Sequence, residues 1–270
     1  MKVYAQTHNI PVIQPENLRD ENFIHELSGL AADLYVVVAF RILPPEVFKI
    51  PPKGTVNLHA SLLPKYRGAA PINWALIHGE KKTGVTTFFI DENIDTGNIL
   101  LQKETNVPPN MTAGELHDEL ATMGAEALLE TVNRIEQGAI KPVRQQGEAT
   151  KAPKLPKQFG NIHWSDPAEK IHNFIRGLSP YPGSYSFLSG VQVKIYLSEI
   201  IEKEASFMVE AGTMISPAKN GPLVVQTGKG LIAILKLQPA GKRIMSAAEF
   251  IHGYRIRGGE KFSNSPHASG

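Results

Sequence analysis

The stretch Leu34-Tyr-Val-Val-Val-Ala-Phe40 decides the fold class of this 270-residue chain. It is an apolar run rich in β-branched and aromatic side chains, and no polar position interrupts it. Such a run is typical of a parallel β-strand that is covered on both faces, as in an α/β protein. The stretch therefore predicts a central strand of a parallel sheet.

Strand and helix patterns alternate on both sides of this run, which indicates an α/β domain. Further strands are expected at residues 10–13, 55–59, 85–90 and 99–107. Helices are expected at residues 2–7, before Leu30, at 70–78 and at 112–137. The last of these helices begins with Thr112 and Glu115 spaced as a capping box. We assign residues 1–138 to this domain.

The composition changes in residues 139–160, which read as a basic linker. Glycines and prolines interrupt the segment, and five cations are interleaved with them: Lys141, Arg144, Lys151, Lys154 and Lys157. Beyond it, a helix is expected at 167–178, and short strands at 193–200, 222–226 and 231–237 are separated by turn residues. Residues 161–270 are therefore expected to form a small, mainly β barrel.

The formal net charge of +2 conceals two halves of opposite sign. Residues 1–138 carry 11 Lys and Arg against 17 Asp and Glu, a net of −6, whereas residues 139–270 carry 17 against 9, a net of +8. A basic half attracts a polyanion such as nucleic acid through counterion release and long-range steering. The alternative is that both halves simply present solvated charges.

Composition excludes several classes of protein. The chain has no cysteine, which rules out a disulfide framework, a thiolate nucleophile and a cysteine-ligated zinc. No apolar run approaches the roughly 18 residues that span a bilayer, and the N-terminus lacks the pattern of a signal peptide. We expect a cytoplasmic protein without a membrane partner.

Two polar side chains, Asn57 and His59, occur two residues apart on the expected strand 55–59. Alternate residues of a strand share one face, so both side chains can address one ligand while Leu58 points into the opposite layer. An amide donor beside an imidazole can stabilise the oxyanion formed when an acyl group is transferred to an amine. A histidine at a strand end is also commonly a structural residue.

A third polar group for this site comes from the loop after the strand at 85–90. Asp95 can accept a proton or orient His59, but Asp91 and Glu92 lie in the same loop and compete for that role. The loop Ser61-Leu-Leu-Pro64-Lys-Tyr-Arg-Gly68 follows the carboxyl end of strand 55–59, where α/β proteins bind ligands. It is equally compatible with a plain connection between strand and helix.

The residues Asn57-Leu-His59-Ala-Ser61-Leu-Leu-Pro64-Lys-Tyr-Arg-Gly68, followed by Asp95-Thr-Gly97, resemble the signature of the folate-dependent formyltransferases. The second half resembles the C-terminal domain of the methionyl-tRNA formyltransferase family through Ile175-Arg-Gly-Leu-Ser-Pro-Tyr-Pro-Gly183 and Leu237-Gln-Pro-Ala-Gly241. The resemblance implies a Rossmann-like domain followed by an OB-like barrel that holds tRNA. It also implies formyl transfer from 10-formyltetrahydrofolate, as co-substrate, to the α-amino group of initiator methionyl-tRNA, without a metal.

Carried onto matching positions, the family's roles place Asn57 and His59 at the formyl oxygen, with Asp95 setting the protonation of His59 and of the amine. The resemblance also implies folate contacts by Ser61, Leu62, Leu63 and Pro64, with Phe40 as a wall of the pterin pocket. The loop 91–95 would border that pocket through backbone groups. We expect a monomer.

The front of the chain departs from the family pattern, which has a first strand with a Gly-Thr-Pro turn, a helix, a second strand and a basic loop. We expect the first domain to be N-terminally truncated, as a gene-model truncation, an expression fragment or a degenerate paralogue. Two other functions are open: formylation of a small amine at the same site, and RNA binding by an inactive fragment.

Overall fold

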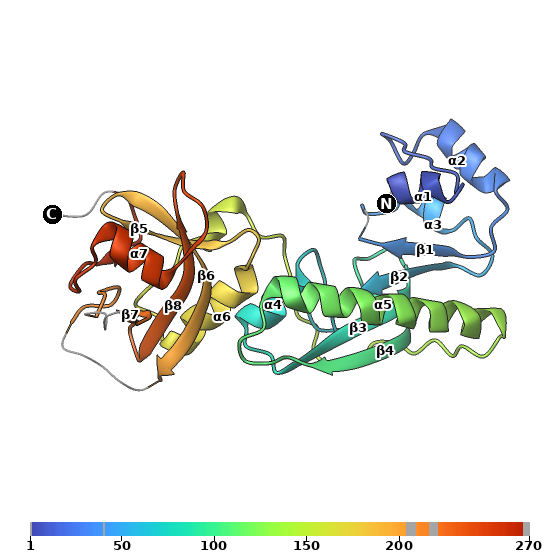
Figure 1. Cartoon of the computed structure of the whole chain (residues 1–270). Helices are drawn as coiled ribbons and strands as arrows, with labels where there is room; N and C mark the ends of the chain where they lie inside the picture. The colour runs from blue at the N-terminus through green and yellow to red at the C-terminus, as the bar shows by residue number, and fades with distance from the viewer. Residues whose placement is uncertain (1, 40, 204–208, 216–220, 267–270) are drawn as a thin grey trace.

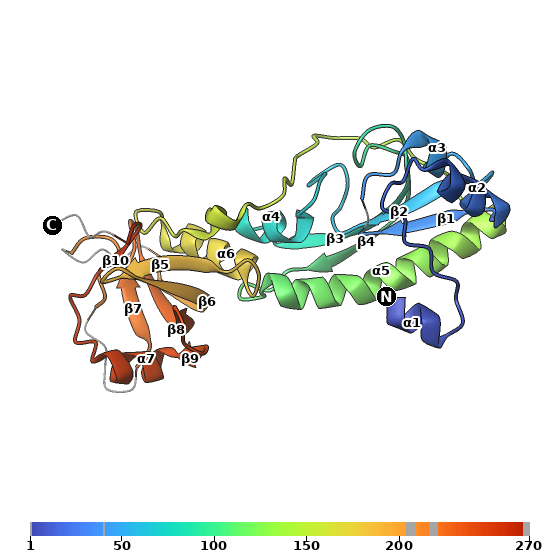
Figure 2. The same cartoon turned by 90° about the horizontal axis from the view of Figure 1, so that it is seen from above.

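The computed structural model describes residues 2–39, 41–203, 209–215 and 221–266. The chain forms an N-terminal half and a C-terminal half that lie end to end, each around its own β-sheet (Figure 1). The long helix α5, Ala113–Glu136, runs along the N-terminal half from the junction with the C-terminal half (Figure 2). The predicted α/β class with a second, mainly β part is confirmed. The expected domain boundaries at 138 and 160 stay predictions.

From residue 21 to residue 89 the N-terminal half alternates between helices and strands, as the sequence patterns indicate. Before α5 they are α1 Lys2–Thr7, α2 Glu21–Gly29, β1 Tyr35–Val38, α3 Pro45–Phe48, β2 Thr55–His59, α4 Pro71–Ile77, β3 Lys82–Phe89 and β4 Ile99–Asn106. The sheet order is β1-β2-β3-β4, with β1 and β2 parallel and the other two pairs antiparallel. The sheet is therefore mixed. Its parallel part consists of β1 and β2, and β2 ends at His59.

The strand β1 corrects one detail of the prediction, because it is an edge strand and not a central one. Among the described residues its only partner is β2, in register from Tyr35 opposite Thr55. Val36 and Val38 are 46% and 45% exposed, so one face of the strand is open. An apolar run can predict a strand, but it does not show how many neighbouring strands or layers cover that strand.

The strand expected at residues 10–13 does not form. The segment has no regular structure, and Ile10 is 53% exposed. Pro11 has no backbone N–H to give to a ladder, which weakens any pairing of this segment with the open edge of β1. The apolar residues here therefore stay outside the sheet, and β1 remains its edge among the described residues.

The helix α5 covers one face of the sheet. Its apolar stripe, which includes Leu116 and Leu120, packs against Val85 of β3. A Cβ atom added at Gly124 would lie 2.6 Å from a methyl carbon of Leu58, so Leu58 points directly at the helix. Asn57 and His59, its neighbours on β2, consequently face the opposite side of the sheet. The predicted capping box at the start of the helix is present.

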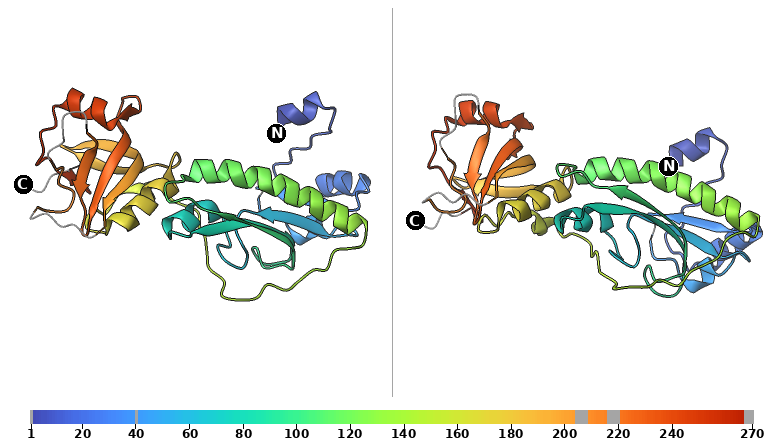
Figure 3. Two further views of the ribbon diagram at one scale, coloured as in Figure 1. Left: turned by 60° about the horizontal axis from the view of Figure 1, so that its bottom comes forward. Right: turned by 90° about the horizontal axis from the view of Figure 1, so that it is seen from below.

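The segment after α5 turns back along the N-terminal half on the side of the sheet away from α5 (Figure 3). Val143 exchanges two backbone hydrogen bonds of 2.8 Å with Ile99 at the start of β4. Further on, Arg67 donates its backbone N–H to Thr150 at 2.9 Å and accepts from the backbone N–H of Ala152 at 2.7 Å. The expected linker is therefore hydrogen-bonded at two points, to the start of β4 and to the loop that follows β2.

The C-terminal half is built from antiparallel strands and three helical segments in the described chain. They are η1 Lys157–Gly160, α6 Ala168–Leu178, β5 Ser184–Leu188, β6 Val191–Glu202, β7 Leu223–Gln226, β8 Leu231–Pro239, β9 Met245–Ser246, α7 Ala247–Tyr254 and β10 Phe262–Ser263. The sheet order is β10-β5-β6-β8-β7, with β9 beside β8. Isolated bridges from Met214 to Val225 and from Thr213 to Lys261 link the two ends of this order, so the sheet closes on itself.

Helix α6 joins the two halves. His172 is 3% exposed, and its two ring nitrogens lie 3.1 Å from the Ser198 hydroxyl and 3.0 Å from the Pro109 carbonyl oxygen. Burial, as the largest cause, lowers the pKa of His172 below its ordinary value. Asn73 of α4 donates to the Gly177 carbonyl at 2.7 Å, and α4 packs closely on α6. The junction is thus held by polar contacts from α6 to α4 and to the loop between β4 and α5.

Candidate active site

The carboxyl end of β2 positions His59, which is only 6% exposed. Its Nε2 lies 2.8 Å from the backbone carbonyl oxygen of Tyr66. Because a carbonyl oxygen can only accept, Nε2 carries the hydrogen of this bond. The other nitrogen, Nδ1, faces the Asp95 carboxylate with 3.6 Å between Nδ1 and Oδ2. Nδ1 is therefore the ring atom left to exchange a proton beside a negative charge.

Asp95 is held in place by its backbone and by a neighbouring amide. Its φ of +54° lies in the left-handed region, which non-glycine residues adopt at a cost of roughly 1 kcal/mol or more. The backbone N–H of Gly68 donates to Asp95 Oδ2 at 2.8 Å. The side chain is 12% exposed. The loop after β2 and the loop after β3 therefore meet at this carboxylate.

The competing carboxylates of the same loop are used elsewhere. Asp91 Oδ1 accepts from the Asn93 backbone N–H at 3.0 Å and from the Thr96 hydroxyl at 2.6 Å, as in a local turn. Glu92 pairs with Lys49 at 2.8 Å, and the hydrogen bond from Lys49 lowers the pKa of Glu92. The structure thus distinguishes three carboxylates that sequence spacing could not rank, and only Asp95 faces His59.

The position two residues after Asp95 can only be occupied by glycine, here Gly97. A Cβ atom added there would lie 1.7 Å from the backbone oxygen of Phe89, so a side chain would force the loop open. The backbone N–H of Phe89 also donates to the Asn98 carbonyl at 3.0 Å, which closes the base of the loop. The glycine is therefore required for the turn that carries Asp95.

Asn57 lies on the same face of β2 as His59, as predicted, and pairs in register with Phe88 of β3. It is half-buried, and its side-chain amide makes no hydrogen bond with any residue that the structure describes. An amide that is shielded but unpartnered is available to a ligand oxygen. Asn57, His59 and Asp95 thus form one polar group at the end of β2.

Tyr66 supplies the carbonyl that fixes the His59 ring, and several contacts hold it. Its hydroxyl donates to Glu80 at 2.8 Å, and its backbone N–H donates to the Thr150 hydroxyl at 2.9 Å. Burial, followed by the hydrogen bond to Glu80, raises the pKa of Tyr66, so the phenol stays protonated. The loop that orients His59 is therefore attached to the turn between α4 and β3 and to the linker.

The stretch expected to contact folate divides between the loop interior and a surface hollow. Ser61 is fully buried and donates its hydroxyl to the Lys65 carbonyl at 2.6 Å, while the Leu63 N–H donates to the Thr86 hydroxyl at 3.1 Å. Leu62 and Pro64 line a hollow of about 370 Å³ on the side of β3. Phe40 lies outside the described residues. Folate contacts by these residues stay a prediction.

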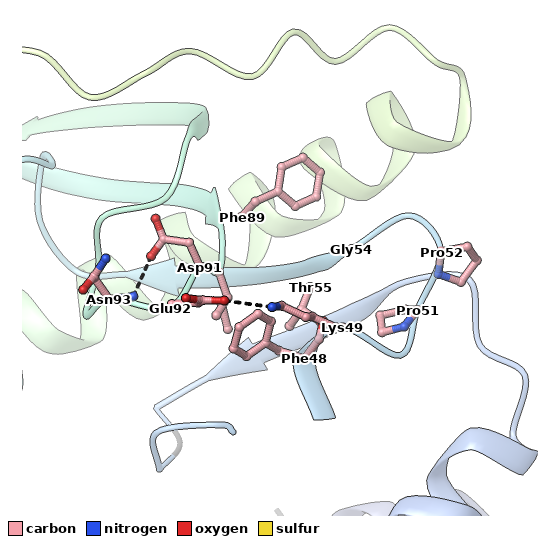
Figure 4. Close-up of a pocket in the computed structure, with 11 residues that line it drawn as sticks. Phe48, Lys49, Pro51, Pro52, Gly54, Thr55, Phe89, Asp91, Glu92 and Asn93 are labelled. Carbon is pink, nitrogen blue, oxygen red and sulfur yellow. Dashed lines mark hydrogen bonds and ion pairs between the residues drawn. The ribbon is translucent and has the colours of Figure 1, made fainter. Parts of the chain in front are cut away.

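A larger hollow of about 630 Å³ lies where β2 begins and β3 ends (Figure 4). Aromatic rings and a loop backbone form its walls. Phe48, Thr55, Phe89 and the loop 91–93 contribute to the lining. Its volume is within the range of pockets that hold small molecules, about 300–1,000 Å³. The loop that lines it reaches Asp95 two residues later, so the hollow and the polar group share one segment.

Sequence reasoning did not find Phe48, Phe89 and Gln145 as residues of this region. The two phenylalanines belong to apolar stretches that read as ordinary core. Phe89 reaches the hollow because β2 and β3 run antiparallel, so the end of β3 lies beside the start of β2, and Phe48 reaches it from the end of α3. Gln145 carried no signal in the linker, yet its amide donates to the Asp95 carbonyl at 2.9 Å. Only the path of the linker across the sheet brings it there.

The sequence matches two family models over most of its length. Residues 2–132 match the formyl transferase model, and residues 154–255 match the formyl transferase C-terminal domain. The methionyl-tRNA formyltransferase of Thermodesulfovibrio yellowstonii is 49% identical over 260 residues, which cover 96% of this chain and 82% of the relative. The chain belongs to the methionyl-tRNA formyltransferase family. A relative of that name from Acetivibrio thermocellus is 43% identical over 96% of this chain and 84% of its own length.

Solved structures share the fold of this family member at low sequence identity. The N-formyltransferase of Helicobacter canadensis in complex with folinic acid and dTDP-3-aminofucose aligns with a TM-score of 0.65 and 22% identity, over 88% of this chain and 81% of that chain. HypX from Aquifex aeolicus in complex with tetrahydrofolic acid gives a TM-score of 0.65 and 20% identity, over 86% and 41%. These similarities support the fold alone.

Proposed function

We propose that this chain transfers the formyl group of 10-formyltetrahydrofolate to the α-amino group of methionine on initiator tRNA, the reaction by which translation is started with formyl-methionine. The observation that carries the proposal is the pairing of His59 with Asp95 beside the unpartnered amide of Asn57. Relatives named for this activity cover both halves of the chain at 43–49% identity.

The reaction moves one acyl group and no net proton. The free amine nitrogen attacks the formyl carbon, and the carbonyl electrons move onto the formyl oxygen. When this tetrahedral intermediate collapses, the bond from carbon to N10 of the folate breaks. The amine nitrogen gives up a proton and N10 takes one up, so the products are formyl-methionyl-tRNA and tetrahydrofolate.

The polar group of Asn57, His59 and Asp95 can stabilise the oxyanion and transfer the proton. The Asn57 amide donates to the developing oxyanion, for which prearranged donors contribute about 3–4 kcal/mol in other acyl-transfer enzymes. His59 Nδ1 receives the proton of the attacking amine and returns it toward N10. Asp95, 3.6 Å from Nδ1, stabilises the imidazolium that forms between these two transfers.

The hollow near β2 and β3 suits the flat ring system of the folate. Phe48 and Phe89 offer aromatic contact, and the backbone of residues 91–93 offers hydrogen-bonding groups of the kind a pterin requires. Contacts from Ser61, Leu62, Leu63 and Pro64 belong to the same proposal through the loop they build. Their side chains would act mainly by shaping that loop, since Ser61 and Leu63 are buried.

The C-terminal half and the linker supply a basic surface for the tRNA. Lys141, Arg144, Lys151 and Lys154 of the linker are all exposed. A small amine acceptor would not need a second domain with a net charge of +8 over residues 139–270. That charge favours tRNA over the small-amine alternative.

No helix that the structure describes is long and apolar enough to cross a membrane. A monomer acting in the cytoplasm is part of this proposal.

The decisive measurement is formylation of methionyl-tRNA by the purified chain with 10-formyltetrahydrofolate, in parallel with His59→Ala. We expect the parent to turn over and the variant to lose about 10²–10⁴-fold in kcat, the usual contribution of a general acid–base residue. A folded parent that binds tRNA but forms no product would instead support the inactive-fragment alternative. Turnover of a small amine in preference to methionyl-tRNA would support the other.

A further inference from the structure

The side chain of Gln145 connects the linker to both loops of the proposed active site. Its Nε2 donates to the backbone oxygens of Asp95 and Gly97, each at 2.9 Å. Its Oε1 accepts from Arg67, at 2.6 Å from Nη2 and 3.2 Å from Nε. Both hydrogens and both lone pairs of the amide are therefore used, which is the full capacity of a glutamine side chain.

These contacts fix the backbone of the Asp95 loop and the loop that donates to its carboxylate. The two carbonyls belong to the left-handed Asp95 itself and to Gly97, and the arginine stands immediately before Gly68, whose N–H donates to the carboxylate. Gln145 thereby ties the loop that carries the carboxylate to the loop that carries its hydrogen-bond donor. A left-handed aspartate persists only where its surroundings over-determine it.

The linker itself is anchored where Gln145 reaches inward. Val143 is hydrogen-bonded in both directions to Ile99, two residues before Gln145. Five residues after Gln145, the Thr150 carbonyl accepts from the Arg67 backbone N–H at 2.9 Å. The glutamine is half-buried between these anchors, whereas its neighbour Gln146 is exposed. The side chain is therefore presented from a fixed backbone and not from a loose one.

We propose that Gln145 is a positioning residue, which sets the Asp95 carboxylate against His59 and makes the linker a structural part of the active site. The proposal rests on the proposed function, because its kinetic readout is formylation. It assigns to the linker a role in the chemical step in addition to any role in holding tRNA. The role is indirect, through Asp95.

Two substitutions separate the donor and acceptor roles of the amide. Gln145→Ala removes all four hydrogen bonds. Gln145→Glu keeps an acceptor for Arg67 but has no N–H for the Asp95 and Gly97 carbonyls, and it places a carboxylate oxygen against them. Gln146→Ala is the matched control, because it is adjacent in the linker and exposed.

We expect both Gln145 variants to lower kcat at least tenfold while the KM for methionyl-tRNA changes less than about threefold, and we expect the control to match the parent. In an Asp95→Asn background, Gln145→Ala should cost less than a further twofold, because its effect passes through the carboxylate. Equal losses in both backgrounds, a raised KM with unchanged kcat, or full activity of Gln145→Glu would each overturn the proposal.

Hydrogen exchange of the folded proteins tests the proposal independently of turnover. Peptides covering residues 91–97 should exchange at least tenfold faster in Gln145→Ala than in the parent or in Gln146→Ala, while β6 and β8 stay unchanged. If the parent does not formylate methionyl-tRNA, the proposed function fails, and this exchange result still decides whether Gln145 holds the Asp95 loop. Unchanged exchange at 91–97 would overturn it.

Discussion

The two halves of this chain use their polar residues in different ways. In the N-terminal half, His59 and Asp95 are shielded from water and fixed by backbone contacts that involve Tyr66 and Gly68. In the C-terminal half, cations such as Lys242, Arg243, Arg255 and Arg257 are exposed around a closed apolar core. A shielded group acts through the position of single atoms, whereas an exposed charge acts through a summed field.

This difference teaches where single substitutions should matter. A substitution in the shielded pair His59 and Asp95 should change the rate of the chemical step and have little effect on the affinity for a polyanion. Removal of one exposed cation changes the field by a small part of its total. Substitutions in the two halves should therefore separate into effects on kcat and effects on the salt dependence of binding.

After His59→Ala, the largest effect is expected from Asp95→Asn. The amide is close in shape to the carboxylate but carries no charge, so the imidazolium of His59 loses its counter-charge. We expect kcat to fall about 100-fold, or roughly 2.7 kcal/mol, while the Kd for tRNA stays within twofold. Steady-state formylation and filter binding measure the two quantities.

Asp118→Asn on the exposed face of α5 is the control for the removed charge, and it should behave as the parent does. A comparable loss of tRNA affinity in Asp95→Asn would show that the shielded group and the basic surface are not separate. The comparison between the halves would then fail at its central point.

An intermediate effect is expected when four linker cations are removed together. The alanine variant of Lys141, Arg144, Lys151 and Lys154 should reduce the slope of log Kd for tRNA against log salt, by about 0.7–0.9 for each phosphate that is no longer neutralised. Its KM for methionyl-tRNA should rise about tenfold at 0.15 M salt with kcat within threefold of the parent. Binding measured from 50 to 300 mM salt gives the slope.

The control removes the same charge from exposed cations of the acidic half. These are Lys2, Arg19, Lys53 and Lys81. An equal reduction of the slope in this control would mean that the linker cations act only through the net charge of the chain. No reduction in the linker variant would leave the tRNA contacts to the C-terminal half alone.

The smallest effect is expected from the junction between the halves. Burial lowers the pKa of His172, so the folded chain binds fewer protons at this site than the unfolded chain below about pH 6.5. The free energy of unfolding should therefore decrease as the pH falls through this range, by at most about 1.4 kcal/mol for each pH unit. Urea unfolding from pH 7.5 to 5 measures it.

His172→Gln should weaken this dependence on pH, since the group that titrates is gone. The exposed His117→Gln is the matched control and should keep the parent's dependence. An identical pH profile in all three proteins would show that protonation of His172 does not contribute to the stability of the junction.

The N-terminal half shows how much of the site could be predicted from sequence. The strand 55–59 was expected with its bounds, and the period of two placed Asn57 and His59 on one face with Leu58 on the other. Local patterns of this kind depend only on the geometry of one strand. The helix α5 and its capping box followed from spacing for the same reason.

Other features depended on partners that are distant in sequence. Local pattern could not show that β1 lies at an edge, or that residues 10–13 would stay outside the sheet. It could not choose Asp95 over Asp91 and Glu92, because the choice lies in which carboxylate faces His59 across two loops.

The sequence by itself determined the α/β class, the basic second half, the identity of the polar residues on β2 and the family resemblance. Only the tertiary structure decided which carboxylate meets the histidine, which ring nitrogen faces that carboxylate, and that Gln145 of the linker is hydrogen-bonded to the Asp95 loop. The physical reason is that side-chain periodicity is a property of one segment. Hydrogen-bond partners 50 residues apart, such as Gln145 and Asp95, are set by how segments pack.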